Sequence, residues 1–231
     1  MAFLILKNAS TQIKQRLHQI LLSGWIGLLI GGRIGYVLIY NFKFFQLHPE
    51  DILKLWQGGM SFHGAVLGCV LGIYLASGKI PTAKILDQLV LLSPIVIFFG
   101  RVCNFLNQEL IGRRTSSNWG VVFSRVSLSE KYLPSQLFEA FFEGVCVGVL
   151  LIWMRKKLTS KPGALTCLFL CSYSVARFLT EFTRAPDQQI GFLWGFITLG
   201  QALSVVTFFV TVILWRKMYA KEWRAEGNVL W

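Results

Sequence analysis

GRVCNFLNQELIGRR, residues 100–114, follows directly on the apolar run LVLLSPIVIFF. Polar and charged side chains therefore stand at the end of a segment whose composition is that of a membrane span. A charge near the centre of a bilayer costs about 2.5–3.5 kcal/mol on insertion scales, so an arginine there usually faces a partner or a polar cavity. In a helix that begins at Arg101, Asn104 and Gln108 lie close to the same face, and Glu109 comes one residue later. This face suits an anionic head group, because a guanidinium group matches phosphate oxygens bidentately.

The whole chain has the composition of a membrane protein. Hydrophobic residues make up 54% of its 231 residues, and charged residues make up 15%. Several apolar stretches approach the roughly 20 residues needed to cross a hydrocarbon core. The net charge of +12 comes from 23 Lys plus Arg against 11 Asp plus Glu. Because much of this charge stands in short clusters between apolar runs, as the positive-inside rule expects, we expect a membrane setting and no nucleic acid partner.

The alternation of apolar stretches and polar breaks predicts an all-α, polytopic membrane helix bundle with about six transmembrane helices. We expect one integral membrane domain over residues 1–231, with a small extramembrane cap at about 108–134, which is too charged and serine-rich to stay in lipid. The basic triplet Arg155-Lys156-Lys157 is expected on the cytoplasmic side, and the cap on the other side. The expected spans are residues 20–42, 60–76, 85–104, 136–154, 163–180 and 192–215.

Metal and nucleotide chemistry find no support in the sequence. The five cysteines form no CxxC pair, so neither a disulfide framework nor a metal site is favoured. The sequence contains no Walker-type phosphate loop, no HExxH and no GxSxG. We therefore expect no metal and no soluble cofactor, and neither a metalloprotease nor an ATP-driven machine.

His63 is the only histidine inside an apolar span, in the stretch GGMSFHGAVLG that begins at Gly58. Two explanations are open for His63. In the structural one, it only forms a hydrogen bond within the helix bundle. The flanking glycines favour a functional site, because small residues let a backbone or a lipid approach closely. An imidazole titrates near neutral pH, which makes His63 a candidate general base.

A second group of polar residues lies in YSVARFLTEFTRAPD, which begins at Tyr173. Arg177 and Glu181 are four residues apart on one helix face. In a purely structural explanation, the two side chains pair only with each other. Tyr173 stands one turn before Arg177 on that face. Together the three residues predict a head-group site at the non-cytoplasmic end of a span. Arg184 and Asp187 are expected to lie at the membrane interface.

Other polar residues have ordinary structural explanations beside functional ones. Arg33, after a double glycine in the first span, either serves a site or extends its charge to the interface. Ser135, Gln136 and Glu139 in YLPSQLFE are available for a site but are also typical of helix amino-terminal capping. Gln201, in the sixth span, is expected to form a hydrogen bond between helices.

Six sequence blocks carry most of these residues, and they cover much of the chain from Gly31 to Ser204. The blocks are GGRIGYVLIYN (31–41), GGMSFHGAVLG (58–68), GRVCNFLNQELIGR (100–113), PSQLFEAFFEG (134–144), RFLTEFTRAPDQQ (177–189) and LGQALS (199–204). In this order they resemble the bacterial prolipoprotein diacylglyceryl transferase family. Six ordered blocks are far more specific than any single motif.

The resemblance implies transfer of the diacylglyceryl group of phosphatidylglycerol to the lipobox cysteine thiol of a prolipoprotein signal peptide, with release of glycerol phosphate. It also implies a multi-pass protein of the bacterial inner membrane whose active site faces the periplasmic or outer leaflet. Matching the blocks residue by residue gives His63, Arg101 and Arg177 as catalytic residues. The substrate-binding residues implied in the same way are Arg33, Asn104, Glu109, Gly112, Tyr173 and Glu181.

The expected chemistry fits these residue types. A thiol with a pKa of about 8.5 is a weak nucleophile until a base or nearby cations favour the thiolate. We expect His63 to help deprotonate the thiol. Breaking a carbon–oxygen bond to phosphate builds charge on the departing group, which Arg101 and Arg177 are expected to stabilise.

The sequence departs from the family pattern at several points. The usual first span is expected to be lacking, and the cap is shorter than in the family. Cys103 and Gln108 stand where glycine is typical, Leu133 where histidine is common, and Phe138 replaces a tyrosine. These departures keep open a non-enzymatic phospholipid-binding or transport relative. A channel or ion transporter ranks last, because the polar groups gather towards one leaflet.

Overall fold

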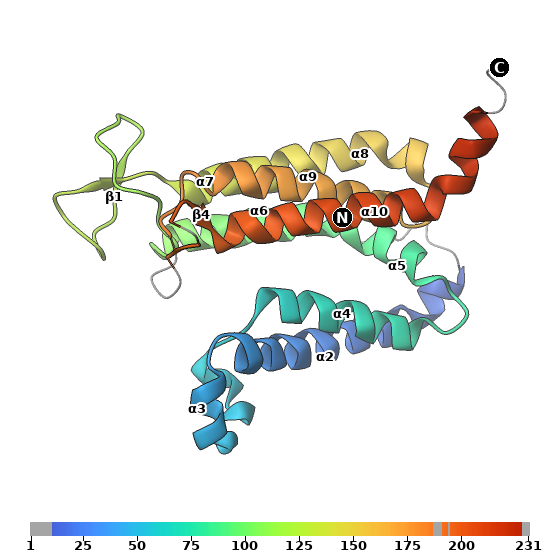
Figure 1. Ribbon diagram of the computed structural model, residues 1–231, viewed down its shortest axis with the longest axis horizontal. Helices are drawn as coiled ribbons and strands as arrows, with labels where there is room; N and C mark the ends of the chain where they lie inside the picture. The colour runs from blue at the N-terminus through green and yellow to red at the C-terminus, as the bar shows by residue number, and fades with distance from the viewer. Residues whose placement is uncertain (1–10, 187–190, 194, 228–231) are drawn as a thin grey trace. The chain divides into compact units, whose positions relative to one another are not determined.

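The computed structural model describes residues 11–186, 191–193 and 195–227 (Figure 1). These residues are mostly helical, with apolar helices long enough to cross a membrane, as expected for an all-α membrane protein. The chain divides into two compact units, Met1–Gln88 (unit 1) and Leu89–Trp231 (unit 2). A single membrane domain over residues 1–231 stays a prediction.

Helix length and hydropathy support part of the expected set of spans. Thr82–Leu89 and Ser93–Leu106 satisfy both requirements only as a pair, with a bend of 44° between them. Two shorter apolar helices, Gly64–Ser77 and Ala164–Thr180, lie in the second and fifth predicted stretches. Within the described residues, three helices meet both requirements alone: Arg16–Ile39, Ser135–Leu158 and Leu199–Tyr219. This gives three spans, or four if the bent pair counts as one, and six stays a prediction.

Unit 1 is built on two antiparallel helices, α2 (Thr11–Ile39) and α4 (Phe62–Ser77) (Figure 1). Glycines repeat every fourth residue along both sides of their contact. A Cβ atom added to Gly31 would collide with the carbonyl oxygen of Gly64, and one added to Gly27 with that of Gly68. The two backbones therefore lie so close that only glycine fits, as in the small-residue contacts of membrane helices.

A surface segment of short helices joins α2 to α4. It consists of α3 (Phe42–Leu47) and two 3₁₀ helices, η1 (Pro49–Leu53) and η2 (Leu55–Gln57). The first helix thus ends before Phe42, the expected end of the first span, and the chain turns into this segment instead.

Unit 2 is a bundle in which four long helices run side by side (Figure 1). The bundle helices are α6 (Ser93–Leu106), α8 (Val147–Leu158), α9 (Ala164–Thr180) and α10 (Leu199–Gly227). Helix α7 (Ser135–Glu139) and the π-helical η4 (Ala140–Cys146) lead into α8 without interruption.

The third and sixth expected spans differ from the prediction at their starts. Helix α5 (Thr82–Leu89) and the 3₁₀ helix η3 (Val90–Leu92) precede α6, where Pro94 in the first turn breaks the run, because proline has no N–H to continue a helix. The sixth span begins at Leu199, since β3 (Phe192–Leu193) and β4 (Ile197–Thr198) form a hairpin before it.

Thr198 and Gln201 close the amino end of α10. The Thr198 N–H donates to Gln201 Oε1 at 3.1 Å, and the Gln201 N–H donates to Thr198 Oγ1 at 3.2 Å. This reciprocal pair is a capping box. The prediction that Gln201 bonds to another helix is therefore wrong for its side-chain carbonyl. This carbonyl caps α10, the helix that carries Gln201.

Residues 108–134, the expected cap, lie at the end of unit 2 where α7 begins (Figure 1). They contain the antiparallel strands β1 (Val121–Val122) and β2 (Lys131–Tyr132). Gln108 has a φ of 57°, in the left-handed region that favours the glycine typical of this position. Helix α6 ends at Leu106, so Gln108 and Glu109 do not continue the helical face expected from the sequence.

Candidate active site

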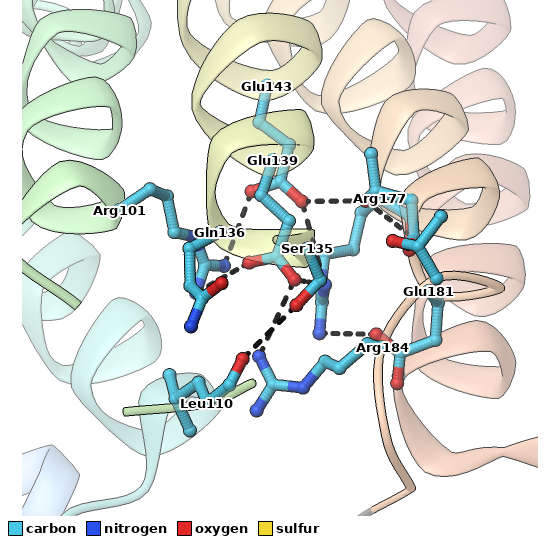
Figure 2. A network of polar contacts seen from close by, with 12 residues as sticks. Arg101, Leu110, Ser135, Gln136, Glu139, Glu143, Arg177, Glu181 and Arg184 are labelled. Atoms are coloured by element: carbon cyan, nitrogen blue, oxygen red, sulfur yellow. Dashed lines mark hydrogen bonds and ion pairs between the residues drawn. The ribbon is translucent and has the colours of Figure 1, made fainter. Parts of the chain in front are cut away.

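Six charged side chains meet at the cap end of unit 2, and we call them the charged cluster (Figure 2). Its members are Arg101 on α6, Glu139 on α7, Glu143 on η4, Arg177 on α9, and Glu181 and Arg184 just beyond α9. The arginine side chains are 11–17% exposed. In ionised form the three cations balance the three carboxylates.

Glu139 stands at the centre of the charged cluster and is fully buried. Its Oε2 lies 2.9 Å from Arg101 Nη1, and its Oε1 lies 3.3 Å from Arg177 Nη1. Arg184 Nη1 is 3.7 Å from the same Oε1. A buried carboxylate is tolerated only with such compensation. Three segments of the chain are therefore tied to one carboxylate.

Glu143, one turn after Glu139, joins the same arginines from the π-helical segment (Figure 2). It is fully buried, and its Oε2 accepts a hydrogen bond from Arg101 Nη2 at 3.3 Å. Its Oε1 lies 3.6 Å from Arg177 Nη1 and accepts a hydrogen bond from Thr180 Oγ1 at 3.1 Å. π-Helical turns are rare and occur often at functional sites.

Arg177 reaches beyond its neighbour on α9. Its Nη2 lies 2.5 Å from Glu181 Oε2, as the four-residue spacing predicts, while its Nη1 contacts Glu139 and Glu143. The alternative that Arg177 and Glu181 pair only with each other is therefore wrong. Glu181 Oε1 also accepts a hydrogen bond from Thr198 Oγ1 at 2.9 Å, beside the positive amino end of α10.

Arg184 lies inside the charged cluster, with 11% of its side chain exposed, and its expected place at the membrane interface stays a prediction. Its backbone bridges to Gly112, and its carbonyl accepts a hydrogen bond from Arg113 Nε at 3.0 Å. These contacts turn the chain after α9 back towards Glu139. Asp187, the other residue expected at the interface, lies outside the described residues.

Comparison with known proteins decides the family. The family model described as prolipoprotein diacylglyceryl transferase matches residues 1–217. This chain belongs to that family.

Three similar relatives are all named phosphatidylglycerol–prolipoprotein diacylglyceryl transferase. The relative from Rhodopseudomonas palustris is 42% identical over an alignment of 201 residues that covers 83% of this chain and 70% of the relative. The relative from Ehrlichia ruminantium is 41% identical over an alignment of 203 residues that covers 85% of this chain and 77% of the relative. The relative from Rickettsia bellii is 39% identical over an alignment of 216 residues that covers 91% of this chain and 81% of the relative.

The first two polar residues of the block PSQLFEAFFEG, Ser135 and Gln136, bond to the backbone next to the charged cluster. Ser135 Oγ donates to the Leu110 carbonyl at 3.2 Å (Figure 2). Gln136 Nε2 donates to the Glu109 carbonyl at 2.5 Å. The residue that caps α7 is Pro134, with no side-chain bond to the first turn. The capping explanation for Ser135 and Gln136 is therefore wrong, since both hold the turn after α6.

Two residues implied by the signature block of the transferase family stand apart from the ion pairs. Asn104 is half-buried, one turn after Arg101 on α6. Glu109 is exposed, and it is its backbone carbonyl that holds Gln136. Their substrate-binding roles stay predictions.

Gly112 and Tyr173 take different places around the charged cluster. A Cβ atom on Gly112 would collide with the carbonyl oxygens of Leu133 and Thr183. Glycine therefore lets the backbone segments around these three residues lie in direct contact. Tyr173 stacks on Phe169 with ring centroids 5.6 Å apart, and it stands one turn before Arg177 on α9. Tyr173 therefore belongs to the surroundings of the site, and Gly112 to its backbone frame.

Arg33 and His63 lie in unit 1. Arg33 is buried and donates to backbone carbonyls between residues 51 and 59. His63 lies in the first turn of α4, and its side chain is outside the described residues. Across the part of the chain that the structure describes, no three His, Cys, Asp or Glu side chains are grouped to hold a metal ion.

Sequence reasoning missed the roles of Glu143 and Arg184, and left Glu139 between two explanations. A signal for the carboxylates was present, because Glu139 and Glu143 are four residues apart within an apolar stretch. Intramembrane carboxylates at that spacing share a helix face and need cations as partners. The signal for Arg184 was weaker, since a single arginine after a span is also typical of the interface.

Proposed function

We propose that this chain transfers the diacylglyceryl group of phosphatidylglycerol to the lipobox cysteine thiol of prolipoproteins and forms a thioether. Membership in the transferase family and the names of the relatives support both substrates. The observation that carries the proposal for this chain is the charged cluster. Its three guanidinium groups keep 11–17% of their side chains exposed, and guanidinium groups bind phosphate oxygens bidentately.

In the proposed reaction the cysteine sulfur attacks the diacylglycerol carbon that carries the phosphate. A carbon–sulfur bond forms, the carbon–oxygen bond to phosphate breaks, and the bonding pair leaves with glycerol phosphate. Arg101 and Arg177 stabilise the charge that builds on this leaving group. His63 takes the proton of the thiol, which converts a weak nucleophile into a thiolate.

The carboxylates of the charged cluster have a preparatory role in this proposal. Buried Glu139 and Glu143 keep Arg101 and Arg177 oriented before the donor binds. The phosphate then meets guanidinium groups whose positions are already fixed, which lowers the cost of reorganisation during the reaction. Asn104, Glu109, Gly112, Tyr173 and Glu181 complete the proposed donor site.

We further propose that the protein spans the bacterial inner membrane six times, with the charged cluster towards the periplasmic or outer leaflet. The helix Ser135–Leu158 supports this orientation, because it carries Glu139 near its first residue and the basic triplet of residues 155–157 near its last. Basic residues of this kind mark the cytoplasmic side. Single cysteines at Ser117 and Lys156, in a chain otherwise free of cysteine, should be labelled from opposite sides. Labelling from the same side would overturn the orientation.

The deciding experiment is transfer of labelled lipid from phosphatidylglycerol to a lipobox peptide by the purified protein. We expect transfer by the parent chain, and its loss in Arg101→Ala and in Arg177→Ala. His63→Gln with full activity would remove the proposed base. Saturable binding of phosphatidylglycerol without transfer would identify a non-enzymatic phospholipid-binding relative instead.

A further inference from the structure

Arg33 of α2 is the most completely bonded arginine of unit 1, with only 6% of its surface exposed. Its guanidinium group donates five hydrogen bonds, and every acceptor is a backbone carbonyl. Nε donates to Ile52 at 2.7 Å, Nη1 to Gly58 at 2.7 Å and Gly59 at 3.1 Å, and Nη2 to Asp51 at 2.5 Å and Lys54 at 3.3 Å.

These contacts leave Arg33 no donor for a phosphate. A guanidinium group has five N–H bonds and no acceptor, so five carbonyls use all of its donors. The rings of Phe45 and Tyr36 cover the group, with centroids 5.1 and 5.9 Å from its central carbon. A lipid phosphate would have to displace both the rings and the backbone. The geometry therefore does not favour the substrate-binding role that the sequence implied for Arg33.

The carbonyls belong to a segment that has little else to hold it. We call residues 51–59 the stapled segment. Two of its large apolar side chains are mostly exposed, Leu53 at 79% and Trp56 at 80%, and Ile52 is only half-buried. Burial of apolar surface, the usual source of stability for a surface segment, therefore contributes little here. The bonds from Arg33 replace it, because each joins a buried charge to a backbone dipole.

The stapled segment leads directly into α4. Gly58 and Gly59 take φ angles of 82° and 80°, and the Ser61 N–H then donates to the Gly32 carbonyl at 2.8 Å, next to Arg33 on α2. Ser61 is also the residue that caps α4, since its Oγ accepts a hydrogen bond from the Gly64 N–H. The start of α4, with His63 in its first turn, is thus fixed to α2 on both sides of the glycine pair.

We propose that Arg33 is a positioning residue for the transfer reaction. It holds the stapled segment against α2 and thereby fixes the start of α4, without contacting the phospholipid. The kinetic part rests on the proposed function, in which His63 acts on the thiol. The structural part, that Arg33 holds residues 51–59, does not depend on any activity.

Two variants and two kinds of measurement test the proposal. Arg33→Gln removes the charge, and Arg33→Lys keeps it on a single nitrogen that cannot reach five separate carbonyls. In both we expect faster hydrogen exchange within residues 51–59 and at the start of α4, and faster tryptic cleavage after Lys54, with α2 and the rest of α4 as protected as in the parent. We expect kcat for transfer to fall about 10- to 100-fold, because small displacements of a reacting group have effects of that size. KM for phosphatidylglycerol should change less than about twofold, because no contact to the donor is lost.

Arg16 provides a matched control on the same helix. It is exposed near the other end of α2, so Arg16→Gln should leave exchange in residues 51–59 and both kinetic constants unchanged. Unchanged protection of the stapled segment in Arg33→Gln would overturn the proposal. So would an Arg33→Lys enzyme that keeps kcat while KM for phosphatidylglycerol rises about tenfold, the pattern of a lost ground-state phosphate contact. A parent chain without transfer would reject the proposed function alone, and exchange would then decide whether Arg33 holds the segment.

Discussion

Unit 1 holds a buried arginine and unit 2 holds partly buried ones, and the two units compensate the charge with different partners. Arg33 in unit 1 is held by backbone carbonyls, and Arg101 and Arg177 in unit 2 are held by carboxylates. A carbonyl is part of the chain and cannot leave without unfolding the segment that carries it. The arginines of unit 2 stay partly exposed, so they can keep their carboxylates and still receive a phosphate. The same residue type therefore serves architecture in one unit and suits chemistry in the other.

The helix contacts of the two units differ in a corresponding way. Helices α2 and α4 are held by direct approach of their backbones at Gly31, Gly64 and Gly68. Around the charged cluster, the helices of unit 2 are instead joined by Glu139 and Glu143, which link α6 to α9. A change of shape should therefore damage unit 1 most, and a change of charge should damage unit 2 most.

The largest effect is expected from Glu139→Gln. Three arginines contact this buried carboxylate, and removing one partner of a buried ion pair typically destabilises a protein by about 3–5 kcal/mol. We expect a much lower unfolding temperature in detergent and loss of lipid transfer. Glu130→Gln, which removes a partly exposed carboxylate of the cap, is the control and should have little effect. An unchanged unfolding temperature in Glu139→Gln would mean that the arginines do not need this carboxylate.

The next effect tests the glycine contact of unit 1. Gly68→Leu places a side chain where a Cβ atom alone would collide with the Gly27 backbone, so α2 and α4 must separate. Overpacking typically costs about 1–3 kcal/mol, and the value should be at the upper end because the colliding atoms are backbone. The control is Gly100→Ala on α6, where a Cβ atom meets nothing within 4 Å. Equal unfolding temperatures for the two variants would contradict the close backbone contact.

The difference between the two units also explains what the sequence could predict. Apolar stretches marked most helices, and the four-residue spacing of Arg177 and Glu181 predicted their ion pair. Pro94 in the sequence indicates the break before α6, and Gly191 and Gly195 indicate the hairpin before α10. These features depend on near neighbours in the sequence, so local patterns are sufficient to predict them.

Local sequence patterns do not predict hydrogen-bond and ion-pair partners that lie far apart in the sequence. Glu143 finds Arg101 42 residues earlier and Thr180 37 residues later, and nothing local selects those partners. For Arg33 the limit is different, because its partners are backbone carbonyls 18 to 26 residues away, which every residue type possesses. An arginine after a double glycine thus indicates a buried charge without indicating whether phosphate or backbone receives it.

A smaller effect separates a hydrogen bond to a charged group from one to a neutral group. Thr180→Val removes the donor to Glu143 Oε1, and hydrogen bonds to charged groups contribute about 1.5–3 kcal/mol. The matched control is Thr211→Val, which removes an equally buried hydroxyl that donates to the Thr207 carbonyl of its own helix. We expect Thr180→Val to lower the unfolding temperature and the transfer rate, and Thr211→Val to change both much less. Equal losses would show that the negative charge of Glu143 adds nothing to the bond.

The smallest effect is expected in the cap, where Arg114 pairs with Glu130. Their side chains are 66% and 32% exposed, so water and salt screen the attraction, and surface pairs of this kind contribute about 0–1 kcal/mol. Arg114→Ala should therefore leave the unfolding temperature nearly unchanged at low and at high salt. A loss as large as that in Glu139→Gln would contradict the comparison, since it would show that exposed and buried pairs stabilise this protein equally. A small, salt-sensitive loss would agree with it, because burial, and not the mere pairing of charges, is what makes the arginines of the charged cluster depend on their carboxylates.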